Sequence, residues 1–415
     1  MSNLKGVNIK RGAVGASRID NDDSVSGLII SSPVISNLAY NTPVAVYNMK
    51  DVEDYGITEA FDENQNVNVW EHLKEFYRLA GEGTELHLMA VNQATNQATM
   101  LGDPAKTLIL AAEGKIRQLA TAVNLSTEDG LVMVDELPQT VHDAIAAAKA
   151  LEEWSEDNFM PLVVFVEGHH YGGTASSAED LRDITDLSAE GVSLVIGQDY
   201  DVAASKTEDT PAQKYAFVGT VLGVTASCTV EQNIGENETK NITNGGKKIL
   251  INPGLSSFDK VSEKYSDLQT LEDKGYIFGM NYAGLGGARL NNDHCCSPII
   301  WDQDNSVNEH TVAYSRVGKK ARRGLRSAYL PKIKTNWTVD KKTGKLSPGT
   351  IVALEAIGDT VLADMQKRGE ITAGESHVDP ESDLIVEKIL RVSYKIVPRG
   401  SLGEISGFIN LKTQL

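Results

Sequence analysis

The sequence predicts a mixed α/β chain with α+β character, built from more than one domain and carrying a strand at each end. Helical and strand-like segments alternate through residues 25–200, an order typical of a parallel sheet covered by helices. The 415 residues exceed what one ordinary hydrophobic core encloses. Residues 384–415 contain two runs in which every second residue is apolar, which is the pattern of strands with one buried face.

The elements of the N-terminal half follow from capping residues and periodicity. Asn68 can cap a helix whose apolar residues recur at helical spacing until Gly81 ends it. Residues 162–166 are apolar on both faces, as a buried parallel strand is. By the same criteria we expect further helices at 105–123, 138–151 and 178–189, and further strands at 86–91, 131–134 and 192–196.

The C-terminal half contains fewer regular signals. Residues 212–234 have helical spacing with small residues between the apolar ones, and an amphipathic helix is expected over 261–271. A long helix is predicted from Pro348 to Arg368, because its apolar residues fall on one face and Gly369 follows.

Both ends of the chain are predicted to form short strands. Val7 and Ile9 alternate with polar residues near the N-terminus, and Ile405, Ile409 and Leu411 do so near the C-terminus. Two arrangements fit this pattern. The last strand can close the sheet of its own domain. Alternatively, because a single covalent connection holds it, it can add to the sheet of a neighbouring copy.

These segments divide the chain into four parts. We predict an N-terminal arm at 1–24, an α/β domain at 25–210, an α+β core domain at 211–400 and a C-terminal arm strand at 401–415.

Charge is unevenly distributed along the chain. Residues 316–345 contain eleven lysines and arginines and one aspartate, whereas the whole chain has a net charge of −18. This strip has three interpretations: a solvated helix face, a surface that docks on an acidic patch of another copy, or a nucleic-acid site. The acidic remainder disfavours the last, because it would repel phosphates. Acidic partners on another copy include Asp20, Asp22, Asp23, Asp51, Glu53, Asp54, Glu59, Asp62 and Glu63.

No catalytic, cofactor or metal site is predicted. The glycine-rich segments lack the spacing of a phosphate loop, and no nucleophile elbow is present. His294, Cys295 and Cys296 are contiguous, so their side chains would point in opposite directions on a strand. An α/β enzyme remains an alternative, with Glu167, His169 and His170 at the carboxyl end of a strand.

The composition also excludes a membrane role. No apolar run reaches the length needed to cross a bilayer, and the first residues contain no apolar signal-peptide segment. Three cysteines do not make a disulfide framework, which suits a reducing cytoplasm.

The C-terminal half resembles one known family, the sheath proteins of contractile phage tails, in the branch of shorter subunits that also occurs in related injection systems. The resemblance covers most of residues 215–415. It rests on segments that follow one another in the family's order: Lys274–Phe278, Gly286–Asp293, Arg316–Arg323, Val339–Leu346, Met365–Ile371, Val378–Pro380 and Ile396–Ser401.

The resemblance implies a structural protein that is not an enzyme and needs no cofactor. It implies a homo-oligomer of stacked six-fold rings around an inner tail tube protein, with baseplate and tail terminator proteins as further partners and no nucleic acid or membrane insertion. Such a chain would assemble in the bacterial cytoplasm and act in the virion tail. Contraction of the sleeve would drive the tube through a cell envelope.

The resemblance also assigns roles to residues at the ends of the chain and in the basic strip. Arms at the two ends would complete a sheet shared between subunits, through Val7, Ile9, Ile405, Phe408, Ile409 and Leu411. Charge contacts between subunits would come from Arg316, Lys319, Lys320, Arg322, Arg323 and Arg326. The sequence leaves open whether the sleeve belongs to a phage, a bacteriocin or another injection system. An acidic module that docks nucleic acid on the basic strip stays an alternative function.

Overall fold

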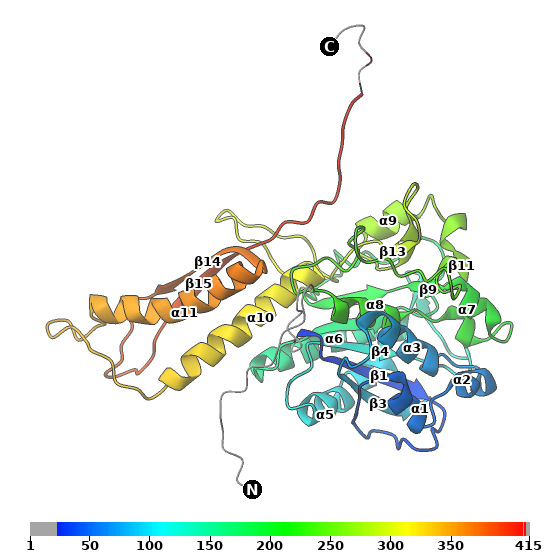
Figure 1. Ribbon diagram of the computed structural model, residues 1–415, viewed down its shortest axis with the longest axis horizontal. Helices are drawn as coiled ribbons and strands as arrows, with labels where there is room; N and C mark the ends of the chain where they lie inside the picture. The colour runs from blue at the N-terminus through cyan, green and yellow to red at the C-terminus, as the bar shows by residue number, and fades with distance from the viewer. Residues whose placement is uncertain (1–22, 410, 412–415) are drawn as a thin grey trace.

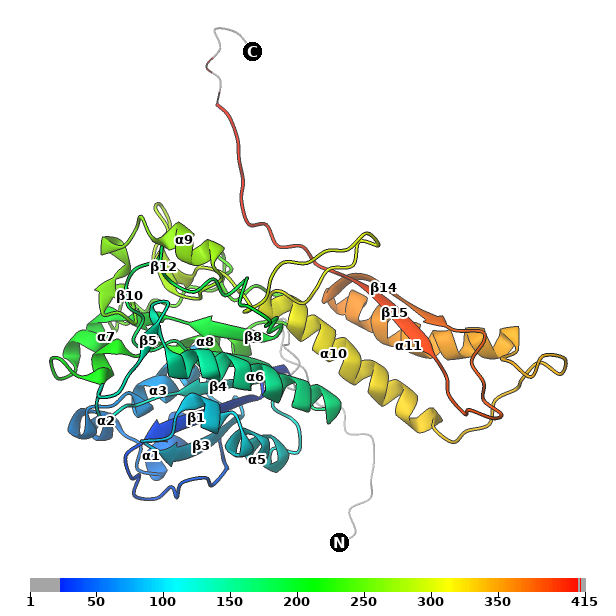
Figure 2. The ribbon, with the colours of Figure 1, turned by 180° about the vertical axis from the view of Figure 1, so that it is seen from behind.

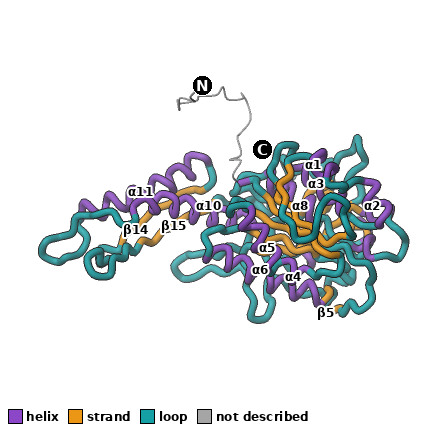
Figure 3. Tube along the Cα trace, turned by 90° about the horizontal axis from the view of Figure 1, so that it is seen from below, coloured by secondary structure: helices purple, strands orange, loops and turns teal. Residues whose placement is uncertain are grey.

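The computed structural model describes residues 23–409 and residue 411. It consists of a large body, an elongated lobe made of α10, α11, β14 and β15, and a C-terminal tail that runs away from both (Figures 1 and 2). The lobe projects from one side of the body (Figure 3). The mixed α/β, multidomain architecture expected from the sequence is thus confirmed.

The body is built on a six-stranded sheet in which all neighbouring strands are parallel except β2 and β3. The first strand of the sequence, β1, lies inside the sheet, with later strands added on either side. In spatial order the strands are β2 (Val44–Val46), β3 (Leu86–Asn92), β1 (Ser26–Ser32), β4 (Gln118–Ala122), β7 (Val163–Glu167) and β8 (Val192–Val195).

Helices cover both faces of this sheet, and alternate residues of each strand enter one of two hydrophobic clusters. Leu28 and Ile30 of β1 pack toward α3 and α8, whereas Ile29 packs toward α5 and α6. The helices of the body are α1 (Met49–Asp54), α2 (Glu59–Gln65), α3 (Val69–Ala80), α4 (Gln97–Met100), α5 (Asp103–Ala111), α6 (Gln139–Asp157), α7 (Tyr200–Ser205), α8 (Val218–Ser227) and α9 (Leu268–Asp273).

Short strands and single turns complete the body. The strands are β5 (Met133–Val134), β6 (Leu137–Pro138), β9 (Gly197–Asp199), β10 (Pro253–Leu255), β11 (Asp259–Lys260), β12 (Gly279–Asn281) and β13 (Ala288–Leu290). The 3₁₀ turns are η2 (Pro211–Lys214) and η3 (Val261–Glu263).

The lobe consists of α10 (Val312–Tyr329), the turn η4 (Leu330–Lys332), α11 (Pro348–Arg368), β14 (Ile371–Val378) and β15 (Val392–Pro398). Helix α10 joins the two parts: Arg316 and Lys319 are buried against the body, whereas Val317 and Ala321 pack against Leu362 of α11. The other face of α11 covers the β14–β15 hairpin.

Two predicted helices are wrong. The helix expected at 105–123 ends at Ala111, and residues 118–122 are strand β4, because Gly114 in a left-handed conformation breaks the helix. No helix forms at 178–189: Leu181 donates its backbone N–H to Lys274, and Asp186 has a positive φ. The helix expected over 261–271 is divided into η3 and α9.

The division of the chain at 24/25, 210/211 and 400/401 stays a prediction of how it separates into folding units. In the described chain, residues of α8 share a hydrophobic cluster with β1 and β3, on the other side of the middle boundary.

Candidate intersubunit surfaces

The C-terminal tail is an exposed apolar feature of the described chain. Ile405, Phe408, Ile409 and Leu411 are each 83–98% exposed, and the described part of the tail pairs with no strand. An apolar row of this kind marks an interaction site in a soluble protein. The described part of the tail therefore does not close a sheet of its own chain, and the addition of the tail to another copy stays a prediction. Val7 and Ile9 lie outside the described residues.

The β14–β15 hairpin is an open sheet. Its two strands are antiparallel, with Gly374 opposite Ile396 and Ser376 opposite Tyr394. Within the described residues each strand pairs only with the other. Ser376 and Val378 of β14 donate backbone N–H groups to Asp359 at 2.8 Å and Glu355 at 3.0 Å, both on α11. The edge of β15 is therefore the more open one, and an open edge can receive an added strand. Because α11 supports one face, the hairpin can receive a strand without a change in the lobe.

Arg316 of the basic strip fixes the start of α10 to the body. Its guanidinium donates to the backbone oxygens of Thr229 at 3.0 Å, Cys228 at 3.2 Å and Asp23 at 3.3 Å. Two of these carbonyls lie just after the last residue of α8, where helix carbonyls lack partners within the helix. Arg316 is therefore a buried link between α8, α10 and the start of β1.

Lys319 and Arg322 continue this connection along α6. The Lys319 ammonium is buried and lies 2.6 Å from a carboxylate oxygen of Glu152 and 3.3 Å from Glu156. Arg322 lies 2.9 Å from Glu156 and 2.7 Å from Glu309. Together these two cations hold three carboxylates of the body.

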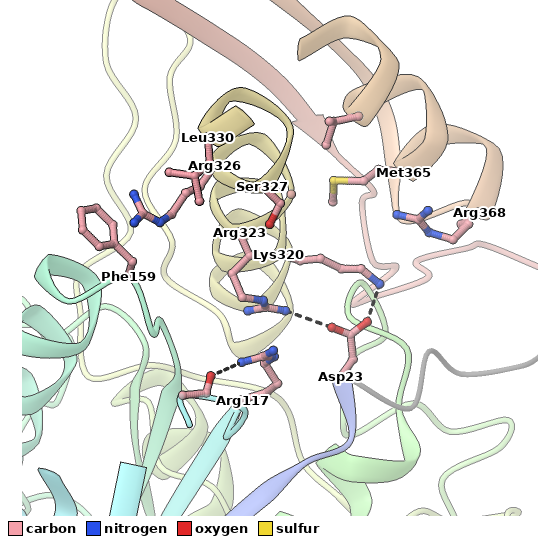
Figure 4. Close-up of a pocket in the computed structure, with 13 residues that line it drawn as sticks. Asp23, Arg117, Phe159, Lys320, Arg323, Arg326, Ser327, Leu330, Met365 and Arg368 are labelled. Atoms are coloured by element: carbon pink, nitrogen blue, oxygen red, sulfur yellow. Dashed lines mark hydrogen bonds and ion pairs between the residues drawn. The ribbon is translucent and has the colours of Figure 1, made fainter. Parts of the chain in front are cut away.

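Asp23 is the centre of a second ionic cluster, at the junction of body and lobe (Figure 4). Its carboxylate contacts Lys320 and lies 3.0 Å from Arg323. Lys320 also lies 2.6 Å from Glu370, the residue just before β14. The Arg326 guanidinium, one turn further along α10, stacks 3.4 Å from the centre of the Phe159 ring.

All six basic residues assigned to intersubunit contacts thus have partners in their own chain. Asp23, which the sequence analysis expected as a partner on another copy, contacts Lys320 and Arg323 of its own chain. The sequence analysis did not single out Glu152, Glu156, Glu309 and Glu370, which are ordinary surface acids by sequence pattern. A role of the strip between subunits stays a prediction.

The polar residues of the enzyme alternative are part of the packing of the body. Glu167 is fully buried and accepts hydrogen bonds from the backbone N–H groups of Val123 and Ala216. Burial raises its pKa to about 8 in spite of these bonds. His169 and His170 are buried, with their Nδ1 atoms 2.9 Å apart. Glu167 therefore ties the ends of two strands to the segment before α8.

The crevice where ligands bind in parallel sheets lies at the carboxyl ends of β1 and β4. Here it holds Asn124, whose side chain donates to the backbone oxygen of Ser31 at 2.9 Å and accepts from the N–H of Asn68 at 2.7 Å. The polar groups in this crevice thus form hydrogen bonds with one another.

The remaining candidate ligands are also buried. Burial raises the pKa of the Cys295 thiol to about 12, so the thiol stays protonated. Within residues 23–409 no group of three or more His, Cys, Asp or Glu side chains is arranged to hold a metal ion. In the same part of the chain, none of the helices has the length and hydropathy of a membrane span.

The histidine pair predicts acid sensitivity. Burial lowers the pKa of His169 to about 3 and that of His170 to about 4; His170 further lowers the first, and Lys214 the second. Because each histidine has a lower pKa in the folded chain than the ordinary 6.5, protonation favours the unfolded chain. The folded state therefore keeps its full stability above pH 6.5 and loses stability as the pH falls toward 4. We expect the stability advantage of the wild type over a His169→Gln, His170→Gln variant to shrink by about 4 kcal/mol from pH 7 to pH 5, about 2 kcal/mol for each histidine. Urea unfolding at both pH values measures this, and a pH-independent difference would contradict it.

Comparison with known families supports the division between body and lobe. A family model described as the DUF2586 N-terminal domain matches residues 4–294, and the DUF2586 C-terminal domain model matches residues 310–415. The second model begins two residues before α10. No curated protein sequence matches the chain.

Solved structures that resemble the chain include a baseplate chain and sheath chains. A chain of the anti-feeding prophage baseplate aligns over 100% of both chains at 13% identity with a TM-score of 0.59. A chain of the contracted PVC sheath complex, from an extracellular contractile injection system, aligns over 100% of this chain and 99% of that one at 11% identity, with a TM-score of 0.58. The contracted helical sheath of the anti-feeding prophage aligns over 100% of both chains at 14% identity, with a TM-score of 0.50. The fold is therefore that of contractile sheath proteins, as the resemblance in the sequence implied.

Proposed function

We propose that this chain, which belongs to the DUF2586 family, is a subunit of a contractile sheath that polymerises as stacked six-fold rings around an inner tube. The observation that carries the proposal is the combination of a sheath fold over the whole chain with an exposed apolar tail and an open two-stranded sheet. Each copy then presents an exposed tail and a sheet edge to which the tail of another copy can add.

The arms at the two ends would join neighbouring subunits by adding strands to their sheets. Backbone hydrogen bonds across an added strand depend little on side-chain fit, so the joint persists while the bodies turn. The bodies exchange one set of surface contacts for another, and the extended sleeve is a metastable state that contracts without nucleotide. If each subunit releases about 2 kcal/mol, about a hundred copies release on the order of 200 kcal/mol.

The partners follow from this role. They are other copies of the chain, an inner tube protein, a baseplate and a tail terminator, without nucleic acid and without membrane insertion. Such a sleeve would assemble in the bacterial cytoplasm and act in a virion tail or a related device, where it drives the tube through a cell envelope.

Electron microscopy of the purified protein tests the proposal. We expect negative-stain images to show rings or hollow sleeves of uniform diameter, increasing with protein concentration. Sedimentation in parallel measures the assembled fraction. A protein that remains monomeric at every concentration, both alone and with an inner tube protein, would overturn the proposal.

A further inference from the structure

Residues 298–308, which precede α10 in the chain, form an exposed hairpin that we call the finger. Figures 1 and 2 show it as a yellow loop beside α10. Trp301 and Val307 form an antiparallel bridge across it. At its turn, the carboxylate of Asp302 accepts the backbone N–H groups of Asp304 at 2.9 Å and Ser306 at 2.8 Å. Local hydrogen bonds thus fix the shape of the turn.

Asn308 fixes the base of the finger. Its side chain accepts the backbone N–H of Ile300 at 3.0 Å and donates to the backbone oxygen of Pro298 at 2.8 Å. It also donates to the hydroxyl of Ser297 at 3.0 Å and to Glu190 of the body at 3.3 Å. A surface element that is already ordered loses little conformational entropy when it binds. The finger is therefore prepared for a contact with another molecule.

The finger exposes apolar side chains although its backbone is well ordered. Trp301 is 76% exposed, and the other exposed apolar residues of the finger are Ile299, Ile300 and Val307. A rigid tryptophan that finds no pocket in its own chain is typical of an interface anchor. The finger also contains Asp302 and Asp304 but no lysine, arginine or histidine. Its chemistry therefore calls for a partner surface that is both apolar and basic.

The far end of the lobe has this composition. Residues 330–342, which we call the tip loop, expose Leu330 and Ile333. Within the described residues, four exposed lysines of the tip loop have no ion-pair partner: Lys332, Lys334, Lys341 and Lys342. The one acid of the tip loop, Asp340, accepts the backbone N–H groups of Lys342 at 2.8 Å and Thr343 at 2.9 Å. The lysines are thus available to an acidic partner.

The acids of the neighbouring loop at 379–391 do not occupy these lysines. Asp379 and Asp383 accept backbone N–H groups of their own loop. Glu387 pairs with Arg391 at 2.9 Å. Lys345, just beyond the tip loop, donates to the backbone oxygen of Glu381 at 3.0 Å. The contacts of this loop therefore leave the charge of the tip loop unpaired.

The finger and the tip loop lie at opposite ends of α10. The finger precedes this helix and the tip loop follows it. At 1.5 Å per residue, the 18 residues of α10 separate them by about 27 Å. Figures 1 and 2 show the chain after α10 at the end of the lobe that is remote from the body. Two surfaces placed in this way match each other across two copies of the chain.

We propose that the finger of one copy docks on the tip loop of a second copy. Trp301 would pack against Leu330 and Ile333, and the acids of the finger would face the lysines of the tip loop. Because the two surfaces differ, the contact is head-to-tail: each copy uses both, and repetition gives a ring or a helix. The inference deepens the proposed function and rests on it for the association of copies, but it does not involve the strand arms.

Disulfide cross-linking between two single-cysteine variants tests the docking. Gln303→Cys places a thiol at the turn of the finger and Asn336→Cys places one on the tip loop; both positions are exposed, and the three native cysteines are buried. We expect mild oxidation of the mixed proteins to give mainly the 303–336 heterodimer, identified by mass spectrometry of the linked peptides. Asn64→Cys, at an exposed position on α2, replaces the finger variant in the matched control. The heterodimer should form at least about tenfold faster than in this control.

Changes of the docking residues test the chemistry of the contact. Adding Trp301→Ser to the finger protein should slow the cross-link about tenfold, because a buried tryptophan anchor is lost. Adding Asp304→Lys should also slow it, and Lys341→Glu with Lys342→Glu in the tip-loop protein should then restore the rate. The Asp304 side chain makes no hydrogen bond or ion pair within the described residues, so the finger keeps its fold.

The products of the reaction distinguish this docking from other contacts. A rate no faster than that of the Asn64→Cys control, or homodimers as the main products, would overturn it. Sleeves of the wild type without the 303–336 cross-link would overturn the docking and leave the proposed function standing. The cross-link in a protein that forms no sleeves would support the docking and contradict the proposed function.

Discussion

Replacing Lys319 by alanine is expected to lower the free energy of unfolding by about 3 kcal/mol, because the buried Glu152 then keeps only its longer contact with Lys149 at 3.4 Å. Lys319 is 1% exposed, and its ammonium lies 2.6 Å from Glu152, itself a buried residue of α6. The pair spans the contact between α10 and the body, so its loss should loosen the lobe first. Urea unfolding measures the free energy, and limited proteolysis after α10 residues reports where the structure opens.

The matched control removes both charges of this pair. A Lys319→Met, Glu152→Leu variant keeps the volume of the site and leaves neither charge unpaired, so it should recover most of the lost stability. Arg322 still neutralises Glu156 in that variant. If the alanine variant loses less than about 1 kcal/mol, the value of an exposed ion pair, then Lys319 does not join α10 to the body.

Elements with strong local signals could be predicted from the sequence alone. Helix α11 begins and ends as expected, because Ser347 caps it, Pro348 occupies its first turn and Gly369 adopts the left-handed conformation that ends it. Strand β7 and helix α6 were likewise predicted from apolar runs and periodicity, and both are confirmed. In each case the residues that determine the element lie inside it or next to it.

Elements that depend on tertiary packing could not be predicted. Strand β4 reads Gln-Leu-Ala-Thr-Ala, a composition that also suits a helix, and it is a strand because it lies between β1 and β7 in the sheet. The segment 178–189 has helical spacing, but its backbone bonds to residues far along the chain. Such long-range contacts outweigh the local helix propensity of the segment.

The partners of the basic strip could not be predicted from the sequence either. Its charge is evident in the sequence, but its partners are 167 residues away for Lys319 and Glu152 and 297 residues away for Lys320 and Asp23. Charge sign does not select among 57 acidic residues. Only the packing of α10 between α6, α8 and α11 does so.

Replacing Ile405, Ile409 and Leu411 together by serine is expected to abolish polymerisation while leaving the folded monomer unchanged. These side chains are 83–98% exposed, so the monomer loses no buried apolar surface, and its melting temperature should stay within about 1 °C. In an added strand, each apolar side chain buried by a partner contributes about 1.5 to 3 kcal/mol. Losing three should weaken association more than about a hundredfold, measured as the concentration at which sleeves appear by sedimentation and microscopy.

The matched control changes the other face of the same predicted strand. Ser406 and Asn410 alternate with the apolar residues, so Ser406→Ala with Asn410→Ala should assemble near the wild-type concentration. The contrast between the two variants separates strand docking from a general effect of altering the tail. If the serine variant assembles as the wild type does, the tail is not the element that joins subunits. A lower melting temperature of the serine variant would instead show that the tail contacts its own chain.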